Sequence, residues 1–114
     1  MPVDEFFTGL FGTALEADEM LTEVEIPSAA QGTGWAFDEI SRRHGDYALA
    51  GMAAAVEVDE DGRCTAARIA LLGVGDAPLL AREAAAALVG QMATEDAVRA
   101  AADAASHRDV DPPG

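Results

Sequence analysis

The chain has 114 residues, enough for one domain with a single core, and it carries 21 acidic residues against 7 basic ones, a formal net charge of −14. This charge repels phosphate backbones and anionic lipid headgroups, so we expect no binding to nucleic acid or to membrane surfaces. Half of the residues are hydrophobic, but many are alanine, and burial contributes only about 25 cal/mol per Å² of apolar area. We therefore expect a thin core that a partner surface would stabilise.

Cysteine and histidine usage argues against a disulfide framework and against a metal site. Cys64 is the only cysteine, and we expect it to be a buried apolar residue. His44 and His107 lie far apart, have no second ligand at metal spacing and are expected at the surface. No set of residues predicts a catalytic triad, so no catalytic residue is assigned. Neither a signal peptide nor an apolar run of about 20 residues is present, which leads us to expect a cytoplasmic protein.

The first predicted element in chain order is a strand over Glu19 to Pro27. Side chains on one face of this segment are apolar or β-branched, those of Met20, Thr22, Val24 and Ile26. The other face alternates with it and carries glutamates, so the period of two predicts a half-buried strand that Pro27 ends.

A second strand and a hairpin are predicted next. Trp35 and Phe37 share one face of an extended run from Trp35 to Arg42. The segment from Leu49 to Leu72 alternates on both sides of the sequence "DEDG", in which Asp61-Gly62 is a strong turn signal. We therefore expect an antiparallel hairpin over 49–72.

Two helices are predicted after the hairpin. The first has Pro78 near its first turn and Gly90 placed to cap its end. The second begins at Thr94, whose hydroxyl can cap it, and runs to about Ser106. The resulting fold class is α+β, with an antiparallel sheet of three to four strands and two C-terminal helices packed on one side.

The glycines between the hairpin and the first helix superficially resemble a dinucleotide-binding loop. Gly73-Val74-Gly75 follows a predicted strand, but Pro78 stands where the third glycine is needed. Asp76 would also place a negative charge beside a pyrophosphate. We interpret the segment as a strand-to-helix turn in which Asp76 caps the helix.

The stretch "SRRHGDYALAGMAAAV", Ser41 to Val56, is the candidate functional segment. Arg42, Arg43, Asp46 and Tyr47 precede an alanine-rich run. From composition alone this corner is either a solvated strand end or a surface that faces a ligand, and both interpretations stay open at this point.

Four segments occur in a fixed order: "FFTGLFGTALEADEMLTEVEIP", "GWAFDEISRRHGDYALAGMAAAVEVDEDG", "ARIALLGVGDAPLLAREAAAALVGQ" and "AVRAAADAASHRDVDP". Together they resemble the medium, FAD-binding subunit of the xanthine dehydrogenase and carbon monoxide dehydrogenase family. The resemblance covers Phe6 to about Pro112. It implies that residues 1–33 correspond to the end of the FAD-binding domain and residues 34–114 to the flavoprotein C-terminal domain.

The resemblance implies a module of a molybdenum hydroxylase, in which electrons pass from molybdopterin through two [2Fe–2S] clusters to FAD. Iron–sulfur and molybdopterin subunits would then be its partners. The loop matching Ser41 to Tyr47 lies beside the flavin ring in that family, and the residue matching Leu21 approaches it. The implied cofactor-binding residues are Leu21, Asp38, Ser41, Arg42, Asp46 and Tyr47.

The sequence also departs from the family pattern. The "AGGT" and "TIGG" loops that hold the FAD pyrophosphate in the family do not occur, and the chain stops before the family's last helix. We therefore expect a fragment that lacks the N-terminal FAD-binding half, binds FAD weakly or not at all alone, and is not catalytic by itself. Two alternatives stay open: a free-standing acidic interaction module that can self-associate, and an inactive remnant.

Overall fold

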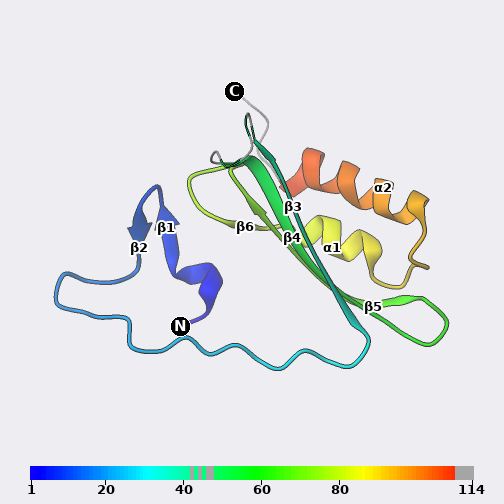
Figure 1. The fold of residues 1–114 in the computed structure, drawn as a ribbon, viewed down its shortest axis with the longest axis horizontal. Helices are drawn as coiled ribbons and strands as arrows, with labels where there is room; N and C mark the ends of the chain where they lie inside the picture. Colours follow the sequence, from blue (N-terminus) through cyan, green and yellow to red (C-terminus); the bar gives the residue numbers. More distant parts are fainter. Residues whose placement is uncertain (42, 44, 46–47, 110–114) are drawn as a thin grey trace.

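A four-stranded antiparallel sheet organises the computed structural model, which describes residues 1–41, 43, 45 and 48–109. The strands follow the order β3-β4-β5-β6 across the sheet, with neighbours in sequence paired as neighbours in space (Figure 1). Their bounds are Thr33–Ser41, Ala48–Val58, Cys64–Leu72 and Leu79–Leu80. The predicted α+β class, the second strand and the hairpin are confirmed.

The turn between β4 and β5 forms as its sequence predicts. The Asp59 carboxylate accepts hydrogen bonds from the backbone N–H groups of Asp61 and Arg63, at 3.0 and 2.9 Å. Gly62 has a φ of +85°, a left-handed conformation that glycine adopts without steric cost. The turn therefore fixes the register in which Ala54 pairs with Ile69.

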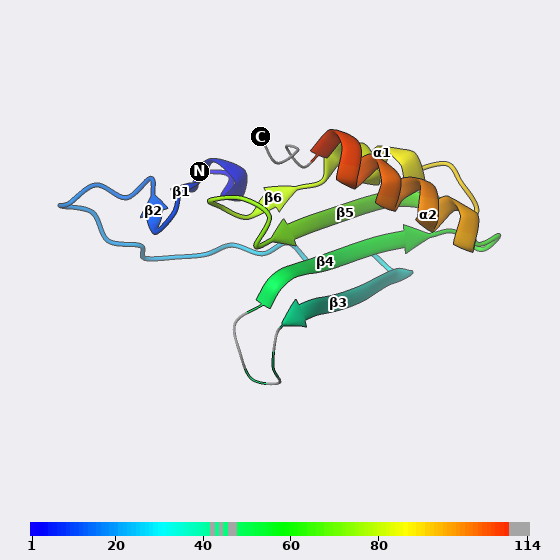
Figure 2. The same cartoon turned by 90° about the horizontal axis from the view of Figure 1, so that it is seen from above.

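Two helices cover one face of the sheet (Figure 2). Helix α1, Arg82–Leu88, packs on β5, and α2, Glu95–Ala104, packs on α1. Thr94 is the N-cap of α2 and accepts a hydrogen bond from the N–H of Ala97 at 3.3 Å, as predicted. The helical backbone continues beyond α2 as a π turn over Ala105–Asp109, a little past the predicted end.

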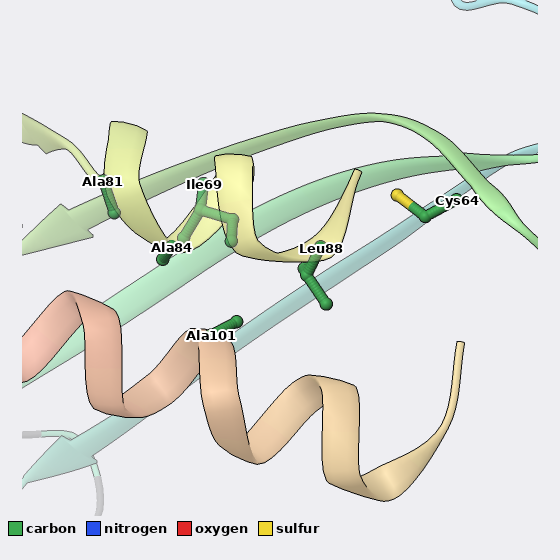
Figure 3. Close-up of a cluster of buried hydrophobic side chains, with 6 residues drawn as sticks. All are labelled: Cys64, Ile69, Ala81, Ala84, Leu88 and Ala101. Carbon is green, nitrogen blue, oxygen red and sulfur yellow. The ribbon is translucent and has the colours of Figure 1, made fainter. Parts of the chain in front are cut away.

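The core lies between this sheet face and the helices and is thin, as expected. Its buried members are drawn in Figure 3: Cys64, Ile69, Ala81, Ala84, Leu88 and Ala101. Half of these are alanine, so the apolar area that the core removes from water is small. Cys64 is 2% exposed, which confirms its predicted burial, and its backbone bonds to Gly90 and Gln91 tie β5 to the end of α1.

The predicted start of α1 is wrong by several residues. Leu79 and Leu80 pair with Leu71 and Ala70 as the short strand β6, so the chain becomes helical only at Arg82. Pro78 therefore precedes a strand and lies outside the helix. Strand pairing with β5 satisfies backbone groups that a helix over this stretch would have bonded internally.

The predicted capping role of Asp76 is also wrong. The N-cap position of α1 is Ala81, which has no side chain that could accept a hydrogen bond. The Asp109 carboxylate accepts instead from the backbone N–H groups of Glu83 and Ala84, at 3.0 and 2.9 Å. The segment that follows α2 thus supplies the anionic acceptor that the N-terminus of α1 needs.

Residues 14–32, which we call the arm, contain neither helix nor strand, so the strand predicted over Glu19 to Pro27 is wrong. A β-strand needs a hydrogen-bonding partner strand, and no described strand pairs with residues 19–27. Before the arm lie a short 3₁₀ helix, Val3–Glu5, and a small hairpin that we did not predict, β1 Phe7–Gly9 with β2 Gly12–Thr13. The described chain is extended, with a radius of gyration of 15.9 Å where about 13 Å is usual for this length.

Candidate functional site

The corner between β3 and β4 is built on an irregular strand pairing. Ile40 pairs with Ala50 but Ser41 pairs with Ala48, so Leu49 is the extra residue of a β-bulge. The Ser41 hydroxyl donates a hydrogen bond to the carbonyl oxygen of Arg43 at 2.9 Å, which holds the first turn of the corner. Bulges of this kind redirect side chains at the end of a strand.

Three of the predicted cofactor-binding residues, Arg42, Asp46 and Tyr47, lie outside the described residues, as does His44. Gly45, between them, has a φ of +86° and so takes the left-handed conformation that a tight corner needs. The other three predicted residues, Leu21, Asp38 and Ser41, precede the corner and lie within the described residues.

Asp38 lies on β3 shortly before the corner and is exposed. Its carboxylate accepts a hydrogen bond from the neighbouring N–H of Glu39 at 2.9 Å. It lines a shallow groove of about 260 Å³ whose other walls are mainly apolar, and these include Ile40, Ala50, Met52, Leu71 and Val74. The groove therefore offers an apolar surface with a carboxylate at its margin.

The loop after β5 forms one side of this groove, a feature that sequence analysis missed. Gly73 has a φ of +77°, and a Cβ at this position would lie 2.6 Å from the carbonyl oxygen of Leu49. The loop thus approaches the bulge of β4 more closely than any other residue type would allow. The sequence signal for this close approach was Gly73, which we assigned only to a turn, with no prediction of the residue that it contacts.

The structure brings Asp38 and Ser41 to the same end of β3 but does not bring Leu21 to them. Leu21 is 52% exposed and lies in the arm, which enters β3 at its opposite end, Thr33. A strand of nine residues is about 30 Å long. None of the residues that line the groove beside Asp38 comes from the arm.

The sheet face that the helices leave uncovered is a second candidate surface. Trp35 and Phe37 stand on it, 67% and 61% exposed, beside a groove of about 460 Å³. The groove is lined by Ala53 and Ala55, small residues of β4, and by Arg68 of β5, which pairs with Ala55. Among the described residues Arg68 has no ion-pair or hydrogen-bond partner.

The described residues contain no group of three or more histidine, cysteine, aspartate or glutamate side chains that could hold a metal ion. Within the same residues, no helix has the length and apolar character needed to cross a bilayer. The groove at the corner can contact a flat apolar group and place a carboxylate near its edge.

Comparison with protein families gives one match over most of the chain. Residues 35–114 match the family described as the CO dehydrogenase flavoprotein C-terminal domain. The match begins in β3 and includes the corner and both helices.

Individual relatives agree with this match. The chain is 40% identical to the 6-hydroxypseudooxynicotine dehydrogenase complex subunit alpha of Paenarthrobacter nicotinovorans and 42% identical to the carbon monoxide dehydrogenase medium chain of Hydrogenophaga pseudoflava. Each alignment covers 92% of this chain and 36% of the relative. The fold also matches a solved carbon monoxide dehydrogenase from H. pseudoflava that lacks the Mo-pyranopterin moiety of its molybdenum cofactor, with a TM-score of 0.86 and 41% identity over 97% of this chain and 38% of that one.

Proposed function

Because the chain belongs to the CO dehydrogenase flavoprotein C-terminal domain family, we propose that it serves as part of the FAD-containing medium subunit of a molybdenum hydroxylase. In this proposal residues 34–114 are the C-terminal domain and residues 1–33 the end of the flavin-binding domain. The observation that carries it is the family match over 35–114, which includes the corner. The partners are iron–sulfur and molybdopterin subunits, and the complex works in the cytoplasm.

The described residues suit one part of FAD and not another. The apolar groove that Asp38 lines suits the edge of a flat ring system. The loop that follows β5 carries Asp76, which repels phosphate. The side chains at the corner therefore fit the ring of FAD, whereas its pyrophosphate needs donors from another part of the subunit, and we expect FAD to bind weakly or not at all to this chain alone.

FAD, when bound, supplies the redox chemistry that passes electrons onward. The role of this chain is to line the ring, exclude water from its edge and set the charge beside it. A carboxylate such as Asp46 close to the ring disfavours an anionic reduced form, and a guanidinium such as Arg42 favours it. Tyr47 would lay an aromatic ring against the cofactor, while Asp38 and Ser41 complete the proposed contacts at this end of β3.

Co-expression tests this function. The chain would be produced together with the part of the H. pseudoflava medium chain that it does not match, and with the iron–sulfur and molybdopterin subunits of that enzyme. We expect a complex that purifies with flavin absorbance, while the chain alone purifies colourless. Failure of the complex to retain flavin would contradict the proposal, and self-association of the chain without flavin would favour an acidic interaction module instead.

A charge substitution at the corner refines this test. In the flavin-loaded complex, Asp46→Asn should raise the reduction potential of the flavin, because it removes a negative charge that opposes reduction. Asp103→Asn, on the exposed surface of α2, is the matched control and should leave the potential unchanged. Equal potentials in both variants would remove Asp46 from the proposed site.

A further inference from the structure

We propose that the chain is adapted to concentrated salt, and that dissolved cations are needed to hold its fold together. This inference goes beyond the proposed function and does not depend on it. The chain has 21 acidic residues against 7 arginines, and it contains no lysine. Even if every arginine paired with a carboxylate, a formal net charge of −14 would remain for cations of the solvent to balance.

The carboxylates are spread over the surface of every layer. Among the described residues no charged side chain is buried. Glu39 on β3, Asp76 in the loop after β5 and Asp103 on α2 are all exposed, and three acidic residues are adjacent in the turn at 59–61. Folding brings these like charges closer together, so their mutual repulsion destabilises the compact state.

The arginines that can be placed offset little of this repulsion. The Arg63 guanidinium donates a hydrogen bond to the backbone carbonyl oxygen of Gly90, at the end of α1. Arg99 lies 3.7 Å from Glu95, but both side chains are exposed, and ion pairs of this kind contribute little to stability. Arg68 lies in the apolar groove of the uncovered sheet face.

The core is too small to outweigh strong repulsion. Ile69 and Leu88 are its large apolar members, and the rest are alanine and Cys64. Apolar burial is the main favourable contribution to folding, and the net stability of a domain is a small difference between large opposing quantities. The balance between the folded and unfolded chain is therefore sensitive to surface charge.

Salt acts on this balance by screening. The Debye length falls from about 30 Å at 0.01 M to about 3 Å at 1 M ionic strength. The described chain measures 50 Å along its longest axis, so in dilute buffer its charges act across much of the molecule. In molar salt each charge acts only on its immediate neighbours. These properties suit a protein that works in a cell interior where salt is concentrated.

Thermal unfolding of the full chain in KCl tests the inference. The midpoint, followed by circular dichroism, should rise by at least about 10 °C between about 0.02 M and about 2 M KCl. Choline chloride should give a similar rise at equal ionic strength, because screening does not depend on the identity of the cation. Sucrose strengthens apolar burial without screening charge, and it should raise the midpoint much less.

A variant with fewer negative charges isolates the electrostatic cause. The changes Glu60→Lys, Asp76→Lys and Asp103→Lys each add two units of charge at an exposed position, so that together −14 becomes −8. The rise with KCl should fall to about half or less, because self-repulsion grows with the product of the charges. Glu60→Asp, Asp76→Glu and Asp103→Glu together keep the charge and form the matched control, which should behave like the unmodified chain.

Four results would overturn the inference: a midpoint that does not change with KCl, a rise that sucrose reproduces, a lysine variant that keeps the full rise, or a chain that stays unfolded in about 2 M KCl. The proposed function is tested separately, by the flavin content of the assembled complex. Loss of salt dependence would leave that function standing, and a complex without flavin would leave the salt adaptation standing.

Discussion

The two faces of the sheet differ in the size of the apolar side chains that they carry. On the helix-covered face, Ile69 is 7% exposed and meets Leu88 and several alanines. On the other face, Trp35 and Phe37 are more than half exposed. A domain that is stable alone usually buries its largest apolar side chains. The exposure of Trp35 and Phe37 therefore indicates a sheet that packs against another layer on each of its two faces.

The difference has an energetic counterpart. Burying a large apolar side chain stabilises a fold by roughly 1.5–3 kcal/mol. The helix-covered face is rich in alanine, whose burial contributes much less. The stabilisation that Trp35 and Phe37 could provide becomes available only when another surface covers them. The chain is therefore expected to be marginally stable alone and more stable in complex.

The largest expected effect contrasts one residue from each face. Ile69→Ala should lower the free energy of unfolding of the isolated chain by about 2–4 kcal/mol, because it leaves a cavity in the core. Phe37→Ala should change it by less than about 1 kcal/mol, because the ring is already exposed. Urea unfolding followed by circular dichroism measures both. Similar losses in the two variants would mean that the second face is covered in the isolated chain.

The next effect concerns the loop that closes against β4. Gly73→Ala should cost about 1–3 kcal/mol, since it combines a positive φ with a backbone contact at 2.6 Å. Gly75→Ala is the control, because a Cβ there meets nothing within 4 Å, and it should be close to neutral. Thermal unfolding compares the pair. A neutral Gly73→Ala variant would show that the loop does not need this close approach.

A smaller effect is expected at the cap of α1, on the covered face. Asp109→Ala should lower the unfolding free energy by about 1 kcal/mol, because two N–H groups lose their carboxylate acceptor. Asp103→Ala, exposed on α2, should change it by less than about 0.5 kcal/mol. Amide hydrogen exchange at Glu83 and Ala84 gives a local readout. Unchanged exchange at these two amides would contradict the assignment of this cap.

The elements that local sequence determines were predictable. The turn at Asp61-Gly62 and the cap at Thr94 depend on residues within a few positions, and both are confirmed. The strand predicted over 19–27 failed because alternation shows only that a segment could be half-buried, whereas pairing needs a neighbour. The start of α1 failed because Leu79 and Leu80 pair with a distant strand.

The site depended on contacts that the sequence does not encode locally. Asp38 and Ser41 lie toward the same end of one strand, so this part of their placement follows from the predicted element. The close approach of Gly73 to Leu49 and the cap that Asp109 supplies join residues that are more than 20 positions apart. Such contacts follow from the packing of whole elements, which no local pattern specifies.

The burial of Cys64 has a practical consequence for handling the protein. Because it is the only thiol and is 2% exposed, a maleimide can reach its sulfur only when β5 separates from the end of α1. The rate of alkylation therefore measures how often this part of the molecule opens. Any ligand that stabilises the closed form will slow the reaction without having to touch the sulfur.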